Sequence, residues 1–167
     1  KTTYPHTTDL GGRLYAGLTD LCDRILEQRE RDDGILLTVS KLLIDAGWGL
    51  STKKIYQFCR EYGRPEVLPY MGFGIKASSK PMSEYTCHSG EMNFNHARLS
   101  AVKDQNIRRI DCDVNYWKTV VTERLGLANG SKGGLTLFKE RPERHKMFAE
   151  QMTSEMSILV KSPTREV

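Results

Sequence analysis

The fold is decided by the segment Ile35-Leu-Leu-Thr-Val-Ser-Lys-Leu-Leu-Ile44, which is followed by Asp45-Ala-Gly-Trp-Gly49. Its β-branched and apolar residues predict a strand over 36–44. The nearly continuous apolar character predicts that this strand is central in its sheet and buried on both faces. Asp45 then lies at the carboxyl end of the strand, where two glycines let the backbone turn sharply.

A carboxylate in this position has two interpretations. It is a common way to present a metal ligand or a contact to a ribose or phosphate. It is equally typical of an ordinary turn, in which the side chain accepts hydrogen bonds from nearby backbone amides. The motif alone indicates where chemistry could take place and does not select between the two.

The neighbouring elements complete an α/β pattern. Apolar residues from Leu14 to Leu26 recur at helical spacing, and the polar run 27–33 with Gly34 ends that helix. A second helix is expected from Ser51 or Thr52 to about Tyr62, followed by a short strand over 66–69. Because strand, helix and strand in this order form a right-handed parallel crossover, the fold class is α/β.

The middle of the chain, 71–106, is rich in glycine, serine and charged residues and has little periodicity. A segment this long without regular structure is more often a functional surface loop than a simple connection. We expect it to hold several small and basic residues near a ligand: Gly72, Gly74, Lys76, Ser78, Ser79 and Lys80. The alternative is a solvated loop that contacts nothing.

Regular elements resume after this loop. The residues 107–113 predict a strand, and Asp113 is expected as the N-cap of a helix from Val114 to about Leu125. The tetrad 135–138 is strand-like. A last helix is expected over 143–155, and its methionines at helical spacing indicate core packing rather than cofactor contacts.

The composition is that of a soluble globular domain. The chain has 167 residues, with 38% hydrophobic and 28% charged side chains, which suits one domain with a substantial core. The net charge of +4 permits nucleic acid binding without demonstrating it. No apolar run approaches the roughly 18 residues that span a bilayer, and the first residues lack the apolar core of a signal peptide. We therefore expect an intracellular protein.

Four cysteines are spaced without any Cys-x-x-Cys pair. Reduced and mostly buried thiols are the expected state. The alternative is a zinc site, although the spacing matches no standard pattern. Its candidate ligands are Cys87, His88, His96 and Cys112.

Short sequence blocks along most of the chain resemble one known family. In chain order these blocks are Asp33-Gly34, Leu43-Ile-Asp45-Ala-Gly-Trp48-Gly-Leu-Ser-Thr52, Ile55-Tyr-Gln-Phe-Cys-Arg60, Val67-Leu-Pro69 through Gly72-Phe-Gly74, Asp113-Val-Asn-Tyr-Trp-Lys118, Arg124-Leu, Gly133-Gly-Leu-Thr-Leu-Phe138, His145 and Met152-Thr-Ser-Glu155. They are similar to the nuclease portion of the large terminase subunit of tailed bacteriophages, the GpA-like family. Colinear matches from about Gly34 to Glu155 carry the resemblance, since each block alone is weak.

This resemblance implies a ribonuclease H-like three-layer domain, with a mixed central sheet flanked by helices and 1–167 forming one partial domain. It implies an endonuclease that cleaves concatemeric double-stranded DNA with two Mg²⁺ or Mn²⁺ ions. It also implies partners, namely the ATPase domain of the same subunit, the small terminase subunit and the portal protein, in the cytoplasm of the host bacterium. The sequence has no Gly-x-x-x-x-Gly-Lys-[Ser/Thr] loop, so this chain is not expected to be the packaging motor.

Carried onto this sequence, the resemblance implies that Asp45 is a catalytic carboxylate and metal ligand. Asp113 is a second possible ligand, with helix capping as the alternative. The family's first-strand acid is expected upstream of Lys1 and its C-terminal acid beyond Val167, so we expect little or no cutting by this chain alone.

Basic residues on loops and near strand ends are candidates for contacts to DNA phosphates, the alternative for each being a solvated charged surface. These residues are Lys76, Lys80, Arg108, Arg109 and Lys118. Trp48 and Trp117 are expected to pack at the edge of the core rather than to stack on bases.

Two alternatives from other classes stay open. One is a nuclease-like module that binds DNA or a packaging partner without catalysis. The other is a small nucleotide-binding α/β protein that uses the Asp45 turn near a ribose or phosphate. Acidic residues in the flanking strand and helix would favour the nuclease over the non-catalytic module. Saturable nucleotide binding without DNA affinity would favour the nucleotide-binding protein.

Overall fold

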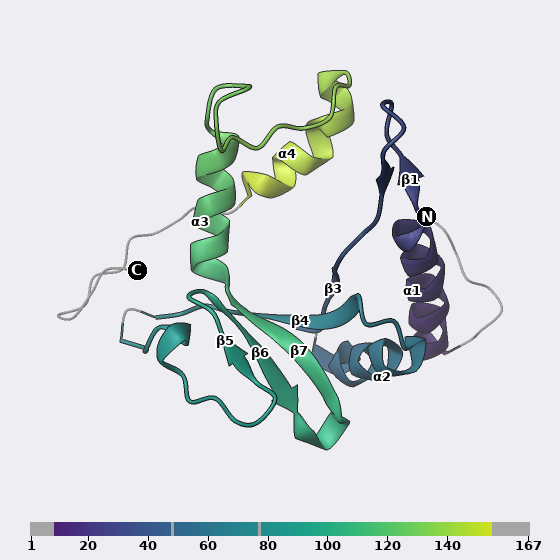
Figure 1. Cartoon of the computed structure of the whole chain (residues 1–167), viewed down its shortest axis with the longest axis vertical. Coiled ribbons are helices and arrows are strands. Elements are labelled where there is room, and N and C mark those ends of the chain that lie inside the picture. The colour runs from purple at the N-terminus through teal and green to yellow at the C-terminus, as the bar shows by residue number, and fades with distance from the viewer. Residues whose placement is uncertain (1–8, 48, 77, 155–167) are drawn as a thin grey trace.

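The computed structural model describes residues 9–47, 49–76 and 78–154 (Figure 1). Its helices and strands are, in chain order, α1 (Leu10–Leu26), β1 (Arg29–Glu30), β2 (Leu36–Leu37), β3 (Leu42–Asp45), α2 (Thr52–Tyr62), β4 (Val67–Phe73), β5 (Met92–Asn93), β6 (Ala97–Val102), β7 (Ile107–Asp113), α3 (Val114–Leu125) and α4 (Lys146–Met152). The expected helices α1, α2 and α3 are all present, and Gly63 ends α2 in the left-handed conformation at φ 69°.

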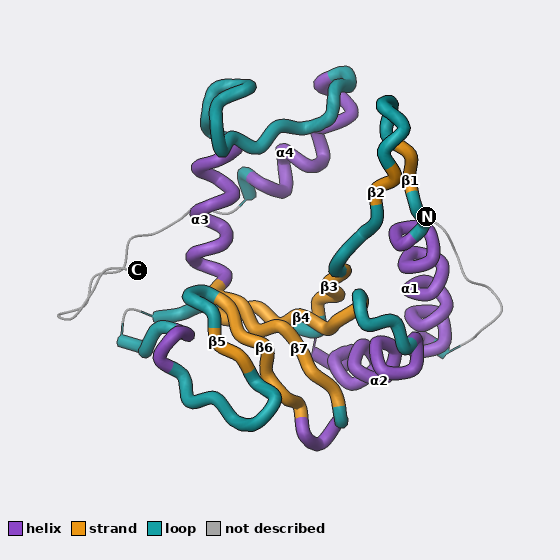
Figure 2. The backbone as a smooth tube through the Cα atoms, viewed as in Figure 1, coloured by secondary structure: helices purple, strands orange, loops and turns teal. Residues whose placement is uncertain are grey.

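The main sheet is mixed and has five strands in the order β3-β4-β7-β6-β5 (Figure 2). β3, β4 and β7 run parallel, whereas β6 and β5 are antiparallel to their neighbours. Helix α2 packs on one face of the sheet, and α3 leaves the end of β7 and contacts β4 and β7. The α/β fold class with a mixed sheet flanked by helices is therefore confirmed.

The prediction of one central strand over 36–44 is wrong in two respects. β2 pairs with β1 in a separate two-stranded hairpin, and β3 begins only at Leu42 and lies at an edge of the main sheet. The hairpin forms because Gly34, at φ 80°, turns the chain back so that Glu30 pairs with Leu36. Leu36 and Leu37 are consequently 60% and 49% exposed. Apolar character could not distinguish this local pairing from burial in a sheet.

The segment 71–106, expected to be irregular, contains the end of β4 and all of β5 and β6. β6 pairs with β7 over six residues, from Ala97–Cys112 to Val102–Ile107. The sequence of β6 has no clear alternation, so its strand conformation depends on the partner β7 rather than on a local pattern.

The C-terminal expectations are only partly met. The segment 135–138 is not a strand, and the expected helix 143–155 is a 3₁₀ turn over Pro142–His145 followed by the short α4. Met147 on α4 is 71% exposed, so its assignment to the core is wrong. Met156 lies outside the described residues.

The core lies between α1, α2 and one face of the sheet. Phe58 of α2 is fully buried at its centre, with Tyr15 of α1 edge-on and Tyr62 stacked on it, both at a ring-centroid distance of 5.1 Å. Cys22 and Val67 complete this cluster from α1 and β4. Burying large apolar side chains in this way contributes about 2 kcal/mol each to stability.

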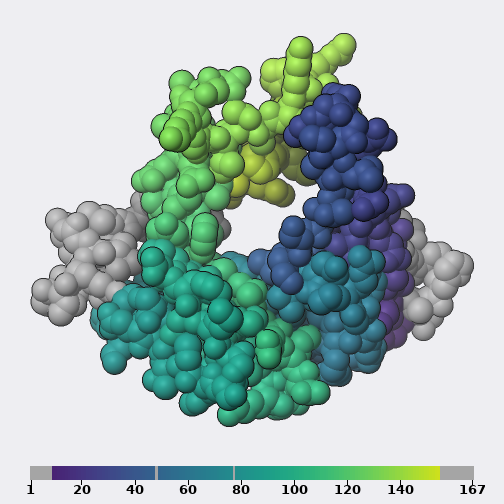
Figure 3. All heavy atoms as spheres, viewed as in Figure 1, coloured from purple at the N-terminus to yellow at the C-terminus, as the bar shows by residue number. Residues whose placement is uncertain are grey.

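The remaining elements extend away from this core. In Figure 3 an opening is visible above the sheet, bordered by α3 and α4 on one side and by the β1–β2 hairpin on the other. Neither α3 nor α4 has a fully buried residue. No helix of the described part of the chain is long and apolar enough to cross a membrane.

Candidate active site

Asp45 is the last residue of β3, and its side chain is exposed. Its Oδ1 accepts a hydrogen bond from the backbone N–H of Gly47 at 2.8 Å, which is the turn geometry expected for Asp before Gly. A Cβ on Gly47 would lie 3.1 Å from the same Oδ1, so glycine keeps the turn close to the carboxylate. Oδ2 accepts no hydrogen bond from the described residues. The turn therefore leaves one oxygen of Asp45 available at the surface.

Backbone contacts hold the turn against the sheet. The N–H of Ala46 donates to the carbonyl of Tyr70 on β4 at 2.8 Å, and the hydroxyl of Thr52 donates to the carbonyl of Ala46 at 2.6 Å. Ala46 itself is fully buried. The first turn of α2 and the strand β4 thus determine together where the Asp45 carboxylate lies.

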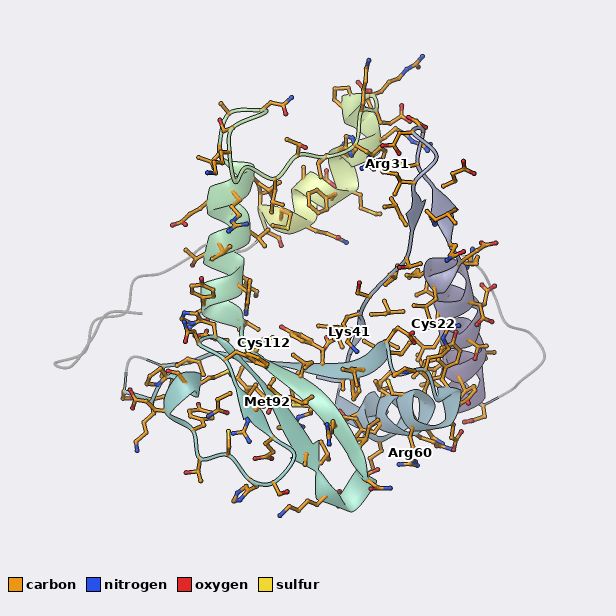
Figure 4. The ribbon with its side chains drawn as sticks, viewed as in Figure 1. Cys22, Arg31, Lys41, Arg60, Met92 and Cys112 are labelled. Atoms are coloured by element: carbon orange, nitrogen blue, oxygen red, sulfur yellow. The ribbon has the colours of Figure 1, made fainter. Side chains whose placement is uncertain are left out.

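Half-buried Tyr70 and buried Cys112 share the sheet face of Asp45. Asp45 pairs with Tyr70 and Tyr70 with Ile110, so these side chains lie on the same face of the sheet. Cys112, labelled in Figure 4, lies two residues further along β7 and therefore on that face too. Burial raises the pKa of the Tyr70 hydroxyl, and the neighbouring Cys112 and Asp45 raise it further. Burial also raises the pKa of the Cys112 thiol, with added effects from Asp111 and Asp113. Tyr70 and Cys112 are therefore neutral neighbours of the carboxylate.

Asp113 is the N-cap of α3, as its position in the sequence predicts. Its Oδ1 accepts hydrogen bonds from the backbone N–H groups of Asn115 at 3.1 Å and Tyr116 at 3.2 Å. Its Oδ2 lies 3.7 Å from Nδ1 of His96. The Asp113 side chain is only 14% exposed. Its contacts are those of a residue that fixes the start of a helix.

The structure does not bring Asp45 and Asp113 together. Asp45 pairs with Tyr70 of β4, whereas Asp113 pairs with Phe73, and β4 separates the two strands. Two strand spacings and an offset of three residues put the Cα atoms roughly 14 Å apart. Because Tyr70 and Phe73 face opposite sides of the sheet, Asp45 and Asp113 also do. The assignment of Asp113 as a metal ligand stays a prediction, but in this arrangement Asp113 and Asp45 do not face the same metal ion.

The described residues do not fit a two-metal centre. No group of three or more His, Cys, Asp or Glu side chains within 9–47, 49–76 and 78–154 is placed to hold a metal ion. Asp45 offers one available carboxylate oxygen, and paired divalent cations need several fixed carboxylates. The alternative zinc site of Cys87, His88, His96 and Cys112 is wrong, since Cys87 is exposed while Cys112 is buried in the sheet.

Two of the five predicted DNA contacts, Lys76 and Lys118, belong to segments that meet at the start of α3. Lys76 and Lys80 are exposed in the segment after β4, which is fixed to α3 because Asn115 Nδ2 donates to the carbonyl of Ile75 at 3.0 Å. Lys118 is exposed on the first turns of α3. Arg108 is exposed at the amino end of β7, away from these lysines.

Arg109 belongs to a polar network that the sequence analysis did not predict. Its Nε donates to Oδ1 of Asp111 at 2.6 Å and a terminal nitrogen donates to the hydroxyl of Tyr56 on α2 at 2.7 Å. Asp111 also accepts from Ser100 at 2.8 Å, and both Asp111 and Ser100 are only 5% exposed. The alternation of Arg109, Asp111 and Asp113 along β7 is the sequence signal that could have indicated a polar face.

These features define a class of protein: an α/β domain with a mixed sheet that presents a carboxylate at the open end of a parallel strand. Comparison with protein-family models then identifies the family. The chain belongs to the family of terminase large subunit gpA endonuclease domains, whose model matches residues 13–166. The resemblance based on sequence blocks is thereby confirmed. Comparisons with curated proteins and with solved structures found no match.

Proposed function

We propose that this chain contributes to the metal-dependent endonuclease centre of a phage terminase large subunit, with Asp45 as a catalytic carboxylate. The observation that supports the proposal is the geometry at the end of β3, where Asp45 is exposed and Oδ2 accepts no hydrogen bond from the described residues. The β4 carbonyl and the start of α2 hold this turn in place. A rigidly held carboxylate with an available oxygen suits a ligand or a base.

The expected cofactor is Mg²⁺ or Mn²⁺, both of which prefer oxygen ligands. Asp45 is our candidate for one of these ligands. Since one carboxylate cannot hold two cations, a two-metal centre would need further ligands beside Asp45, and the described residues bring no group of three metal-ligating side chains together.

The proposed substrate is concatemeric double-stranded DNA. Lys76, Lys80 and Lys118 are candidates for contacts to its backbone. Arg108 and Arg109 are weaker candidates, because Arg108 lies at the amino end of β7 and Arg109 is paired with Asp111. Contacts to phosphates position a duplex without reading its sequence, which suits an enzyme that accepts many sequences. Replacing one such lysine is expected to reduce the slope of the logarithm of the binding constant against the logarithm of the salt concentration by about one.

The proposed partners follow from family membership. They are the ATPase domain of the same subunit, the small terminase subunit and the portal protein, acting together in the host cytoplasm. No described surface distinguishes among these partners.

The decisive experiment measures duplex cleavage by the intact terminase with Mg²⁺ or Mn²⁺. Asp45→Asn is expected to reduce cleavage at least about a hundredfold while leaving duplex affinity unchanged, since it removes charge without changing shape. Asp104→Asn is the matched control, because Asp104 is an exposed carboxylate in a turn before β7. Undiminished cleavage by Asp45→Asn would remove Asp45 from the active site.

A second candidate function is a nuclease-like module that binds DNA or a packaging partner without catalysis. It is favoured by one observation, namely that no three metal-ligating side chains of the described residues converge. Under this hypothesis the intact protein binds duplex DNA and does not cleave it with either metal. Family membership leaves no observation in favour of a small nucleotide-binding protein.

A further inference from the structure

Three aromatic rings form a continuous cluster where α3 leaves β7. The ring of His96 is stacked on the ring of Tyr116, with centroids 3.4 Å apart and planes inclined by 6°. The ring of Trp117 meets that of Tyr116 edge-on, at 5.3 Å and 82°. His96 precedes β6, whereas Tyr116 and Trp117 belong to the first turn of α3. We call these three residues the ring cluster.

The ring cluster is held in place by backbone contacts. The carbonyl of His96 accepts a hydrogen bond from Nε1 of Trp117 at 3.1 Å and another from the backbone N–H of Asp113 at 3.0 Å. Asp113 in turn caps α3 and has its Oδ2 3.7 Å from the His96 ring. Since these contacts involve the chain on both sides of the cluster, the rings keep one arrangement without a ligand. Such pre-organisation lowers the entropic cost of binding.

Two of the three rings are nevertheless exposed, contrary to the expectation that Trp117 packs at the edge of the core. Tyr116 is 39% and Trp117 44% exposed, and Phe94, two residues before His96, is 49% exposed. His96 covers one face of the Tyr116 ring, and no residue of α3 is buried. A contiguous group of exposed rings is a candidate for a binding surface.

Two lysines adjoin residues of the ring cluster or its neighbour Asn115. Lys118 directly follows Trp117 in α3. Asn115, directly before Tyr116, donates a hydrogen bond to the carbonyl of Ile75, and Lys76 is the next residue of that segment. Rings beside lysines are the combination that binds single-stranded nucleic acids, in which bases stack on the aromatic faces and phosphates meet the cations.

We propose that the ring cluster binds unpaired bases of single-stranded DNA. The inference rests on the proposed function, in which DNA is the substrate of the same domain, and it adds the structural form of DNA that this surface recognises. In a duplex the faces of the bases are already stacked on each other, so the rings gain nothing from it. In an unpaired segment those faces are available, and stacking does not depend on base identity.

The test compares the affinity of the 167-residue chain for labelled oligothymidylate and for a hairpin duplex of equal length, measured by fluorescence anisotropy. Trp117→Leu is expected to weaken binding of the single strand roughly tenfold and to change duplex binding by less than about twofold. Trp117→Phe keeps an aromatic face and is expected to restore most of the affinity, which separates stacking from a loss of folding.

Phe138→Leu is the matched control. Phe138 is 71% exposed and lies edge-on to His145 at 4.7 Å, so it is another exposed ring beside a histidine, but it lies away from the start of α3. Its replacement is expected to leave both affinities unchanged.

A direct readout comes from fluorescence, because the chain has two tryptophans. In the Trp48→Phe background Trp117 is the remaining one, and oligothymidylate is expected to quench it. Equal loss of single-strand and duplex affinity in Trp117→Leu, or binding without quenching, would overturn the proposal. Absence of any binding of oligothymidylate by the wild-type chain would also overturn the proposal and would indicate a protein partner for the rings. Cleavage of duplex DNA by the intact terminase is measured separately, so either hypothesis can fail without the other.

Discussion

Arg109 and Asp111 form an ion pair on β7, with Nε and Oδ1 2.6 Å apart and side-chain exposures of 20% and 8%. Asp111→Ala would leave the guanidinium of Arg109 largely buried without its carboxylate. Removing one partner of a buried pair is strongly destabilising, so we expect the free energy of unfolding to fall by about 3 kcal/mol. Urea denaturation of the purified chain measures this change.

Asp104→Ala removes an exposed carboxylate from the turn before β7 and serves as the control for the ion pair. Its effect is expected to stay within about 0.5 kcal/mol. The double variant Arg109→Met with Asp111→Leu is expected to recover part of the loss, because apolar side chains avoid the unpaired charge. Equal stability of Asp111→Ala and Asp104→Ala would contradict the assignment of a buried pair.

Gly72 allows the close approach of α3 to β4. A Cβ on Gly72 would collide with Cγ1 of Val114, the first residue of α3. Gly72→Ala is therefore expected to destabilise the chain by about 1–3 kcal/mol, measured as a lower thermal midpoint. Val114→Ala in the same chain removes the colliding methyl and is expected to restore part of the stability.

Gly74→Ala is the matched control for Gly72, since the nearest atom to its added Cβ is Oδ1 of Asn115 at 3.8 Å, an ordinary contact distance. Gly74→Ala is expected to lower the thermal midpoint much less than Gly72→Ala does. A similar cost at Gly72 and Gly74 would show that the effect comes from backbone entropy rather than from Val114.

Glu91 should make the stability of the chain depend on pH. Hydrogen bonds from the backbone N–H groups of His88 and Ala101 lower the pKa of Glu91 below its usual 4.5, and Arg98 lowers it further. A carboxyl group with a lowered pKa in the folded state contributes stability above the pKa of the unfolded state and loses it as the pH falls through the folded value. The stability difference between the wild type and Glu91→Gln is expected to be constant near neutral pH.

Below about pH 4.5 that difference should shrink, because Glu91 becomes protonated in both states. Urea midpoints across pH measure it, with Glu123→Gln, an exposed carboxylate on α3, as the control. A difference between wild type and Glu91→Gln that stays unchanged down to acidic pH would contradict the role of ionised Glu91.

One cysteine should be far more reactive than the others. Cys87 is exposed, whereas Cys22, Cys59 and Cys112 are buried, and burial raises the pKa of Cys59 to about 12. Because the thiolate is the reactive form, iodoacetamide is expected to modify one thiol of the folded chain at mildly alkaline pH, and four after denaturation. Mass spectrometry counts the adducts, and Cys87→Ser should remove the fast one. Rapid modification of a second thiol would show that the sheet or the α1–α2 core opens readily.

Local patterns were sufficient for α1, α2 and α3 and for the cap of α3. The helical spacing of apolar residues in α1 and α2 and the position of Asp113 before Val114 predicted these elements, because spacing and capping act between residues within one or two turns. The turn at Asp45 was predicted for the same reason, since a side chain that accepts from an amide two residues on is a local interaction.

The position of β3 at the sheet edge, the strand conformation of β6 and the pairing of β2 with β1 depend on partners far along the chain or on a turn. An apolar run is compatible with each of these outcomes, so its composition could not choose among them. The same holds for the sites. The sequence alone identified the family and offered Asp45 as a candidate site residue. Tertiary structure decided that Asp113 faces the other side of the sheet, that Arg109 pairs with Asp111 and that His96 stacks on Tyr116. Register and strand order set those distances, and both arise from pairing between segments distant in the sequence.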